Sequence, residues 1–235
     1  MKRASRLIAA IAFLATGTAM SGSAIAADNI DLGVSPTAMP WYIELLAGGP
    51  IPRDYDATLF GTAPIVYDPD PGFMISGAIG KYFTPNIRAD LNVSYAWAED
   101  GAVAFVAAPA FPIPHTGRVS ATTILGSVYY EFQDVMPNVT PWVGVGAGAT
   151  IFNYSGLGAT GVGGFTFDDS DTAFTAAGHL GFDYALNTNV DFTARYSLTY
   201  TGSHNVTGQP GNVALAADSQ VNNIFMAGFR FKFGN

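Results

Sequence analysis

Two stretches of the chain alternate between apolar and other side chains, and this alternation limits the folds that are open to it. In Ile87–Trp97 and in Val190–Tyr200 every second residue is apolar, and the residues between are mostly Arg, Asp, Asn, Ser or Thr. Because successive side chains of a strand point to opposite faces, each stretch predicts a β-strand with one apolar and one polar face. Periodicity alone leaves open which face meets water.

The composition decides between a soluble sheet and a membrane sheet. Soluble domains carry about 25% charged residues, mostly on their surface, whereas only 12% of these 235 residues are charged. The polar strand positions hold mainly small residues, which suit a crowded barrel interior, and aromatic residues gather near the strand ends, as they do in the interfacial girdles of outer-membrane barrels. We therefore expect a closed sheet with its apolar face in lipid.

The first 27 residues have the pattern of a secretory signal peptide. Three basic residues within the first six positions precede an apolar run over Leu7–Ala15, and the small residues of Ala24–Ala27 offer a cleavage site. The apolar run is too short to span a bilayer as a helix. We predict a signal peptide over residues 1–27, a short periplasmic tail over 28–40 and an outer-membrane barrel over 41–235; the alternative is a retained N-terminal anchor.

Charge and cysteine content exclude several classes of function. Without the signal peptide, seven of the 10 Lys and Arg residues remain against 18 Asp and Glu, a formal charge of −11. Such a chain is a poor partner for nucleic acid, whose phosphates require basic residues. There is no cysteine, so neither a disulfide framework nor a thiolate metal site can form. We expect no nucleic-acid partner, no cofactor and no metal.

Eight segments have the length of membrane-spanning strands, which need about 9–11 residues when tilted. They are Trp41–Gly49, Phe73–Phe83, Ile87–Trp97, Val119–Phe132, Val139–Phe152, Ala173–Ala185, Val190–Tyr200 and Val221–Phe233. Short turns alternate with long segments between them. The long segments are Pro50–Gly72, Ala98–Arg118, Asn153–Thr172 and Thr201–Gln220. This arrangement predicts an all-β, eight-stranded, antiparallel up-and-down transmembrane barrel with periplasmic turns, extracellular loops and both termini in the periplasm.

One predicted strand contains glycine at every second position of Gly144–Gly148. Glycine weakens an ordinary strand and often marks the close approach of another group. In a narrow barrel, we expect these bare inward positions to accept bulky neighbours such as Tyr129.

Four pieces of the chain resemble a known family. They are GKYFTPNIRADLNVSYAW (Gly80–Trp97), TPWVGVGAG (Thr140–Gly148), DFTARYSLTY (Asp191–Tyr200) and GFRFKF (Gly228–Phe233). They are similar to small eight-stranded outer-membrane barrels of Gram-negative bacteria, of the opacity and surface-antigen type related to OmpA-like and OmpX-like barrels. The expected partners are outer-membrane lipid, lipopolysaccharide and the assembly machinery that reads the C-terminal strand. Such proteins usually end on an aromatic residue, whereas Gly234 and Asn235 follow Phe233 here.

Assigning each strand's residues to its two faces places nine charged side chains inside the barrel. They are Glu44, Arg88, Asp90, Glu131, Asp183, Asp191, Arg195, Arg230 and Lys232. Nearly all lie close to a periplasmic turn or terminus, and the inward positions further up the strands are mostly neutral. Because buried charges are costly unless paired, these four cations and five anions predict an ion-paired plug in the periplasmic half. The alternatives are acid–base catalysis and an ion path.

The histidines are the remaining candidates for catalysis. Some eight-stranded barrels modify lipid A with a serine, a histidine and a carboxylate within reach of one another. His204 follows Ser203, His115 lies in an apolar loop and His179 is assigned to the lumen. Adjacent Ser and His residues in a sequence do not imply a triad, and we predict no catalytic residues.

The long segments contain the candidate binding regions. Asp54–Asp56, Tyr67–Pro71 and Asp168–Asp171 are rich in carboxylates, which can hold Ca²⁺. None of the three has an EF-hand pattern, so solvated acidic tips are the preferred interpretation. The mostly apolar Ala102–Ile113 either prolongs its hairpin, packs over the mouth, or contacts lipopolysaccharide or a partner.

We therefore expect a non-enzymatic outer-membrane protein, a structural scaffold with long extracellular loops available for binding. The alternative is a narrow channel or carrier for small or hydrophobic solutes. A plug of paired Arg and Asp favours the scaffold, and a continuous gap past Gly144, Gly146 and Gly148 favours transport.

Overall fold

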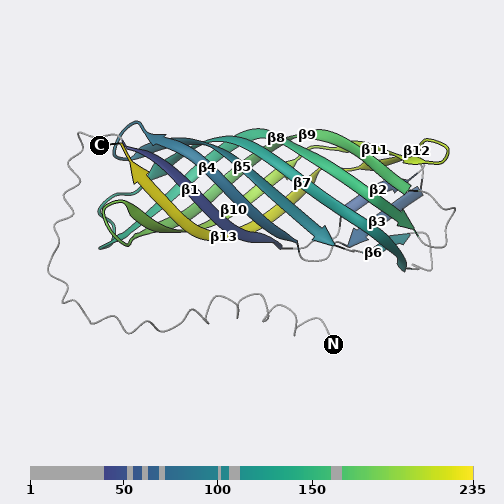
Figure 1. Ribbon diagram of the computed structural model, residues 1–235, viewed down its shortest axis with the longest axis horizontal. Helices are drawn as coiled ribbons and strands as arrows, with labels where there is room; N and C mark the ends of the chain where they lie inside the picture. Colours follow the sequence, from purple (N-terminus) through teal and green to yellow (C-terminus); the bar gives the residue numbers. More distant parts are fainter. Residues whose placement is uncertain are drawn as a thin grey trace, which may run out of the picture. The chain divides into compact units, whose positions relative to one another are not determined.

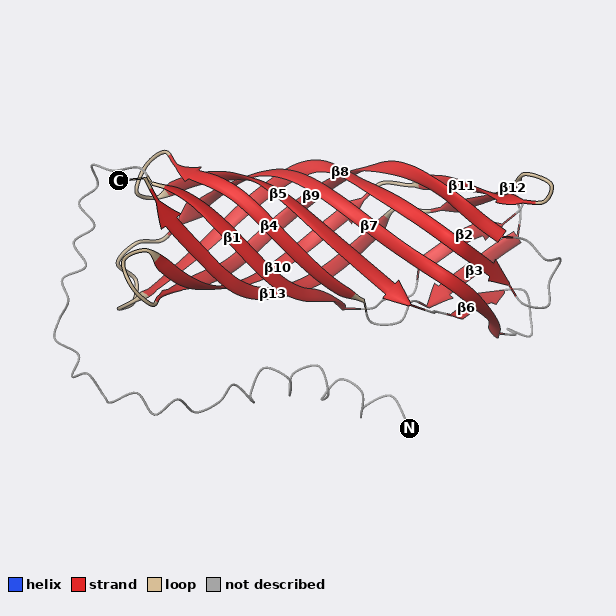
Figure 2. Ribbon diagram, viewed as in Figure 1, coloured by secondary structure: helices blue, strands red, loops and turns tan. Residues whose placement is uncertain are grey.

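The structure, a computed structural model, describes residues 40–51, 55–59, 63–68, 72–99, 102–105, 112–159 and 166–234. The predicted signal peptide and all but the last residue of the predicted periplasmic tail lie outside these residues. No helix in the described part of the chain is long and apolar enough to cross a membrane. The described residues are organised as strands joined by turns (Figure 2).

Eight long strands form a closed ring. They are β1 (Trp41–Ile51), β4 (Phe73–Tyr82), β5 (Ile87–Glu99), β7 (Pro112–Glu131), β8 (Val139–Ala159), β9 (Thr166–Ala185), β10 (Val190–Thr201) and β13 (Gln220–Phe233). Each pairs antiparallel with the next in this order, and β13 pairs with β1, with Trp41 opposite Phe233 (Figure 1). Closure gives every strand of the ring two partners and removes the sheet edges. The predicted eight-stranded antiparallel barrel is confirmed.

The strand bounds agree with the sequence prediction at the short-turn end and exceed it at the other. β1, β4, β5, β10 and β13 match the predicted bounds to within two residues at each end. β7 and β9 each begin seven residues earlier than predicted, and β8 ends seven residues later. These three strands therefore continue well beyond the predicted membrane-spanning lengths.

The sequence predicts loops for the long segments, and the structure shows additional strands within them. They contain five short strands, β2 (Tyr55–Leu59), β3 (Ala63–Asp68), β6 (Ala102–Phe105), β11 (His204–Gln209) and β12 (Val213–Ala217). These pair in the order β6, β3, β2, β12, β11. They join β7 to β9 at the end of the barrel opposite the short turns, which we call the upper end (Figure 1). Each of these strands pairs with one strand of its own long segment and with one strand from another, and local periodicity cannot reveal the second kind of pairing.

The apolar segment Ala102–Ile113 shows one of the three arrangements considered for it. Its first residues form β6, and Ala102 to Ala104 pair with Pro114 to Pro112 at the start of β7. The backbone therefore prolongs the hairpin. The side chains of this segment lie outside the described residues.

The two faces of the barrel wall have opposite character. Along β1, Trp41, Ile43 and Leu45 point outward with 45%, 41% and 55% of their surface exposed, and the alternating Tyr42 and Glu44 are buried. The same alternation places large apolar side chains on the outside of the other transmembrane strands. Exposed apolar area of this extent marks contact with lipid rather than water.

Candidate functional site

The interior of the barrel contains the predicted charged residues. Eight of the nine are buried and the ninth, Lys232, is half-buried. The structure joins seven of them into one network and leaves Asp191 and Lys232 as a separate pair, with 2.9 Å between Oδ1 and Nζ. The network residues are Glu44, Arg88, Asp90, Glu131, Asp183, Arg195 and Arg230, and we call them the plug.

Arg230 lies at the centre of the plug and is fully buried. Its Nη2 lies 2.7 Å from Oε2 of Glu44, and its Nη1 forms ion pairs with Asp183 and, at 3.4 Å, with Glu131. Arg195 pairs with the other oxygen of Glu44. One carboxylate from β1 therefore bridges two guanidinium groups from β10 and β13, which satisfies the charges that burial would otherwise penalise.

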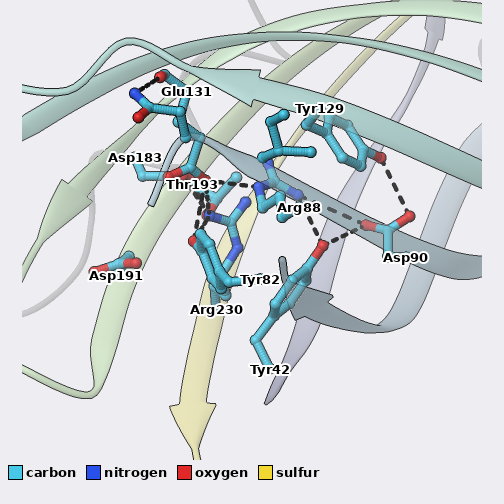
Figure 3. A network of polar contacts seen from close by, with 12 residues as sticks. Tyr42, Tyr82, Arg88, Asp90, Tyr129, Glu131, Asp183, Asp191, Thr193 and Arg230 are labelled. Atoms are coloured by element: carbon cyan, nitrogen blue, oxygen red, sulfur yellow. Dashed lines mark hydrogen bonds and ion pairs between the residues drawn. The ribbon is translucent and has the colours of Figure 1, made fainter. Parts of the chain in front are cut away.

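Arg88 connects the rest of the plug (Figure 3). Its Nε donates to Oε1 of Glu131 at 2.7 Å, and its Nη1 donates to the hydroxyl of Tyr42 at 2.9 Å. The Tyr42 hydroxyl in turn donates to Asp90 at 3.0 Å, and Tyr129 donates to the other oxygen of Asp90 at 3.4 Å. Tyr42 thereby links a carboxylate and a guanidinium whose closest atoms are 3.7 Å apart.

Aromatic rings close the space around the plug. Tyr42, Tyr129 and Trp142 have no more than 1% of their surface exposed. The guanidinium carbon of Arg88 lies 3.9 Å from the ring centroid of Tyr129 and 5.0 Å from that of Trp142, within the range of cation–π attraction. Tyr42 and Trp142 occupy inward positions of their strands, but no charge or motif in the sequence marks them as part of the site.

The glycines of β8 and β9 make room for these rings. A Cβ added at Gly144 would lie 2.3 Å from Cδ1 of Tyr129, and one added at Gly181 would lie 2.5 Å from Cζ2 of Trp142. The expectation that bare positions accept bulky neighbours is confirmed at Gly144. The space beside Gly144 is therefore occupied by side chains.

The histidines do not form a catalytic triad among the described residues. Nδ1 of His179 lies 2.8 Å from Oγ of Ser197, and its Nε2 has no partner there. His204 stacks on Phe152 with 4.0 Å between ring centroids, and its Nε2 lies 2.7 Å from the hydroxyl of Tyr154. Neither imidazole has a carboxylate on its other nitrogen to orient it as a base. The side chain of His115 lies outside the described residues.

The acidic tract Asp168–Asp171, predicted as a solvated tip, is exposed or half-exposed and belongs to a strand. It lies within β9, where Asp169 accepts a hydrogen bond from the backbone N–H of Thr207 at 2.8 Å and Asp171 from that of Asn205 at 2.7 Å. Carboxylates from one strand thus bind the backbone of the neighbouring strand β11. The backbone N–H groups of Asn205 and Thr172 both donate to the Asp171 carboxylate, and these hydrogen bonds lower its pKa.

Metal ligation finds no support in the described part of the chain. No group of three or more His, Asp or Glu side chains there is arranged to hold a metal ion. Of the other acidic clusters, Asp54 and the side chains of Tyr55–Asp56 and Tyr67–Pro71 lie outside the described residues.

Comparisons with known proteins agree with this architecture. The family model of the outer membrane protein beta-barrel domain matches residues 11–233. The crystal structure of the outer membrane protein OprG from Pseudomonas aeruginosa is similar with a TM-score of 0.54 and 16% identity, over 84% of this chain and 97% of that one.

Two further solved structures match with lower TM-scores. Neisserial surface protein A, NspA, gives 22% identity and a TM-score of 0.47 over 82% of this chain and 97% of its own. Ail, the attachment invasion locus protein of Yersinia pestis, gives 14% and 0.35 over 81% and 98%. Among curated proteins, none matches the sequence significantly. The family match spans nearly the whole chain, and the protein therefore belongs to the outer-membrane β-barrel family and is a protein of the cell outer membrane.

Proposed function

We propose that this protein is a non-enzymatic, non-conducting scaffold of the outer membrane that presents its long extracellular segments for binding. The observation that carries this proposal is the plug. Arg88, Arg230 and Glu44 have at most 1% of their surface exposed, and they bind side chains from several different strands across the lumen. An eight-stranded barrel is only wide enough for its own side chains to fill.

The energetics of the plug favour a permanently closed lumen over a gated one. Opening a path would separate Arg230 from Glu44, Glu131 and Asp183. Removing one partner of a buried ion pair typically costs about 3–5 kcal/mol. At a cost of that size the open form would be populated less than about 1% of the time, since each 1.4 kcal/mol is a factor of about ten.

The histidine geometry supports the non-enzymatic part of the proposal. His179 and Ser197 form a hydrogen-bonded pair, but a serine nucleophile also needs its base held in place by a third group. In the described chain, Nε2 of His179 has no such partner.

The expected partners follow from the outward face. Apolar side chains of the wall contact acyl chains of the outer membrane, and the extracellular strands meet lipopolysaccharide. Phe229, Phe231 and Phe233 stand on the outward face of β13, where the assembly machinery would read the C-terminal strand.

Planar-bilayer recording tests the proposal. The full-length protein and the variant Tyr130→Ala should give no stable current steps, because Tyr130 points outward with 47% of its surface exposed. The variant Tyr129→Ala, one residue away, removes a ring that packs against Arg88 of the plug and should conduct. Stable ion-selective openings in the unmodified protein would instead support the alternative function of a narrow channel or carrier.

A further inference from the structure

On the side of the plug that faces away from the short turns, the lumen contains a cavity of about 180 Å³. Residues from all eight transmembrane strands line it. Arg195 and His179 lie at its floor, next to the plug. Its mouth is bordered by Ile51, Trp97 and Gln220, at the upper ends of their strands. The cavity is therefore a dead end on the periplasmic side.

The two sides of this cavity differ chemically. Met74, Ile224 and Met226, on β4 and β13, form an apolar patch on one side of the wall, and Leu46 of the intervening β1 packs against them. The polar Ser76 and Asn222 line the cavity beside this patch. The opposite arc of the ring carries a ladder of threonine hydroxyls from β7, β8, β9 and β10. Its members are Thr123, Thr150, Thr175 and Thr201, with oxygen–oxygen distances of 2.8, 2.7 and 3.5 Å.

Polar groups along the cavity retain capacity for further hydrogen bonds. The four ladder hydroxyls have four protons but make three bonds with one another, and each oxygen can accept twice. At the floor, Nε of Arg195 and Nε2 of His179 are buried and have no partner in the described chain. Both residues are more than nine-tenths buried. Unsatisfied buried polar groups of this kind call for a partner such as water or a ligand.

The charges around the cavity disfavour an ionic ligand. Arg195, the plug residue that lines the cavity, already has its guanidinium paired with Glu44, and the plug as a whole contains four carboxylates against three guanidinium groups, so an anion meets net repulsion. A cation would instead meet Arg195 at the floor. An uncharged ligand avoids both penalties and the cost of moving an ion out of water.

Volume and side-chain chemistry narrow the ligand further. A cavity of about 150 Å³ lined by apolar residues is large enough to bind benzene, so this one accepts a single aromatic ring with a short substituent. Methionine sulfur makes favourable contacts with aromatic rings, and Met74 and Met226 both line the apolar side. A hydroxyl on the ring would reach the threonine ladder.

We propose that the upper lumen is a binding site for one small uncharged aromatic alcohol of the phenol type. The ring packs against Met74 and Met226, and the hydroxyl group bonds to the ladder at Thr150. This site is separate from any binding by the extracellular strands, and it needs no passage through the plug.

Binding of 4-fluorophenol to the full-length protein in phosphatidylcholine nanodiscs, followed by ¹⁹F NMR, tests the proposal. We expect saturable binding of one molecule per barrel, above the partitioning into empty nanodiscs. The probe 4-fluorotoluene, which lacks the hydroxyl, should bind about tenfold more weakly, the equivalent of one hydrogen bond at the upper end of its usual range.

Binding measurements on three variants test whether the probe occupies the lumen. Ala96→Phe fills the cavity and should abolish saturable binding, whereas Ala89→Phe, on the outward face of the same strand, should leave it unchanged. Thr150→Val removes a ladder hydroxyl while keeping the side-chain shape. This variant should weaken the binding of 4-fluorophenol by about five- to tenfold and leave the binding of 4-fluorotoluene unaffected.

Two results would overturn the proposal. One is a signal no larger than that of empty nanodiscs, which would mean that the cavity holds water only. The other is equal binding to the unmodified protein and to Ala96→Phe. If Ala96→Phe does not fold, Thr150→Val decides the matter, and equal losses for both probes in that variant would exclude recognition by the ladder.

Discussion

Tyr129 on β7 and Gly144 on β8 face each other across the strand pair, and the tyrosine ring occupies the space where a glycine side chain would begin. The ring also lies against the Arg88 guanidinium and contributes its hydroxyl to Asp90. The bare position on β8 is therefore a condition for the plug, because only glycine lets the ring lie flat between the wall and Arg88.

Adding a single methyl group at this position should disturb the plug. In Gly144→Ala the new Cβ would lie 2.3 Å from Cδ1 of Tyr129, and overpacking of this kind usually costs about 1–3 kcal/mol. We expect the free energy of unfolding, measured with urea in phospholipid vesicles, to fall by that amount.

Gly126→Ala is the matched control, since no atom lies within 4 Å of a Cβ added there. It should be neutral, or stabilising by about 0.5–1 kcal/mol because alanine restricts the unfolded chain. Equal unfolding midpoints for the two alanine variants would contradict the packing described for Tyr129.

Removing Arg230, the central cation of the plug, should lower the free energy of unfolding more than removing Lys232, which lies outside the plug. Arg230→Met leaves Glu44, Glu131 and Asp183 without their shared partner, and we expect a loss of about 3–5 kcal/mol in unfolding free energy. Lys232→Met breaks a single ion pair, in which Lys232 is half-buried and Asp191 is buried, and should cost less, about 1–2 kcal/mol.

The double variant Arg230→Met/Asp183→Asn separates charge from packing, because Asp183 pairs with Arg230 in the plug whereas Glu44 keeps its pair with Arg195. Neutralising the orphaned carboxylate should recover part of the loss, because an uncompensated buried charge is the main penalty. No recovery would mean that Arg230 acts through its volume rather than its charge.

Attachment of β11 to β9 should weaken in acid. The backbone N–H groups of Asn205 and Thr172 bind the ionised carboxylate of Asp171 and lower its pKa below the ordinary 3.8. A carboxyl group whose folded pKa is lowered stabilises the folded form above its ordinary pKa, and this contribution is lost as the pH falls through the lowered value. Protection of the Asn205 amide against hydrogen exchange should therefore decrease below about pH 4.

Burial of the neighbouring His204 lowers the pKa of its imidazole below the ordinary value of 6.5. Its neutral form is the one favoured by folding, so this residue adds a loss of stability that begins as the pH falls below 6.5. Asp171→Asn should reduce protection of the Asn205 amide at neutral pH and remove the acid-dependent step below pH 4. Asp218→Asn, in the β12–β13 connection, should change neither, and an unaltered acid step in Asp171→Asn would rule out this attachment.

The transmembrane part of the fold could be predicted because one periodicity governs it. A period of two assigns Ile87–Trp97 and Val190–Tyr200 to strands, and it also decides that Arg88 and Arg195 point inward. Low overall charge then orients the apolar face toward lipid. Burial of these residues needs no information beyond the alternation itself.

The partners of each charged residue could not be predicted in the same way. Arg230 and Glu44 are 186 positions apart in the sequence, and their contact depends on the closure of β13 onto β1. His179 and Ser197 meet because the register of β9 and β10 places them opposite each other. The short extracellular strands were missed for the same reason, since their pairing joins segments from different loops.

Side-specific labelling tests the closed lumen most directly. The chain has no cysteine, so Thr199→Cys places a unique thiol in the cavity above the plug, and Asn189→Cys places one in a periplasmic turn. With an uncharged, hydrophilic thiol reagent that does not cross the membrane and is small enough to enter the cavity, Thr199→Cys should react only from the extracellular side and Asn189→Cys only from the periplasmic side. Reaction of Thr199→Cys at the same rate from both sides would show that the plug does not close the barrel.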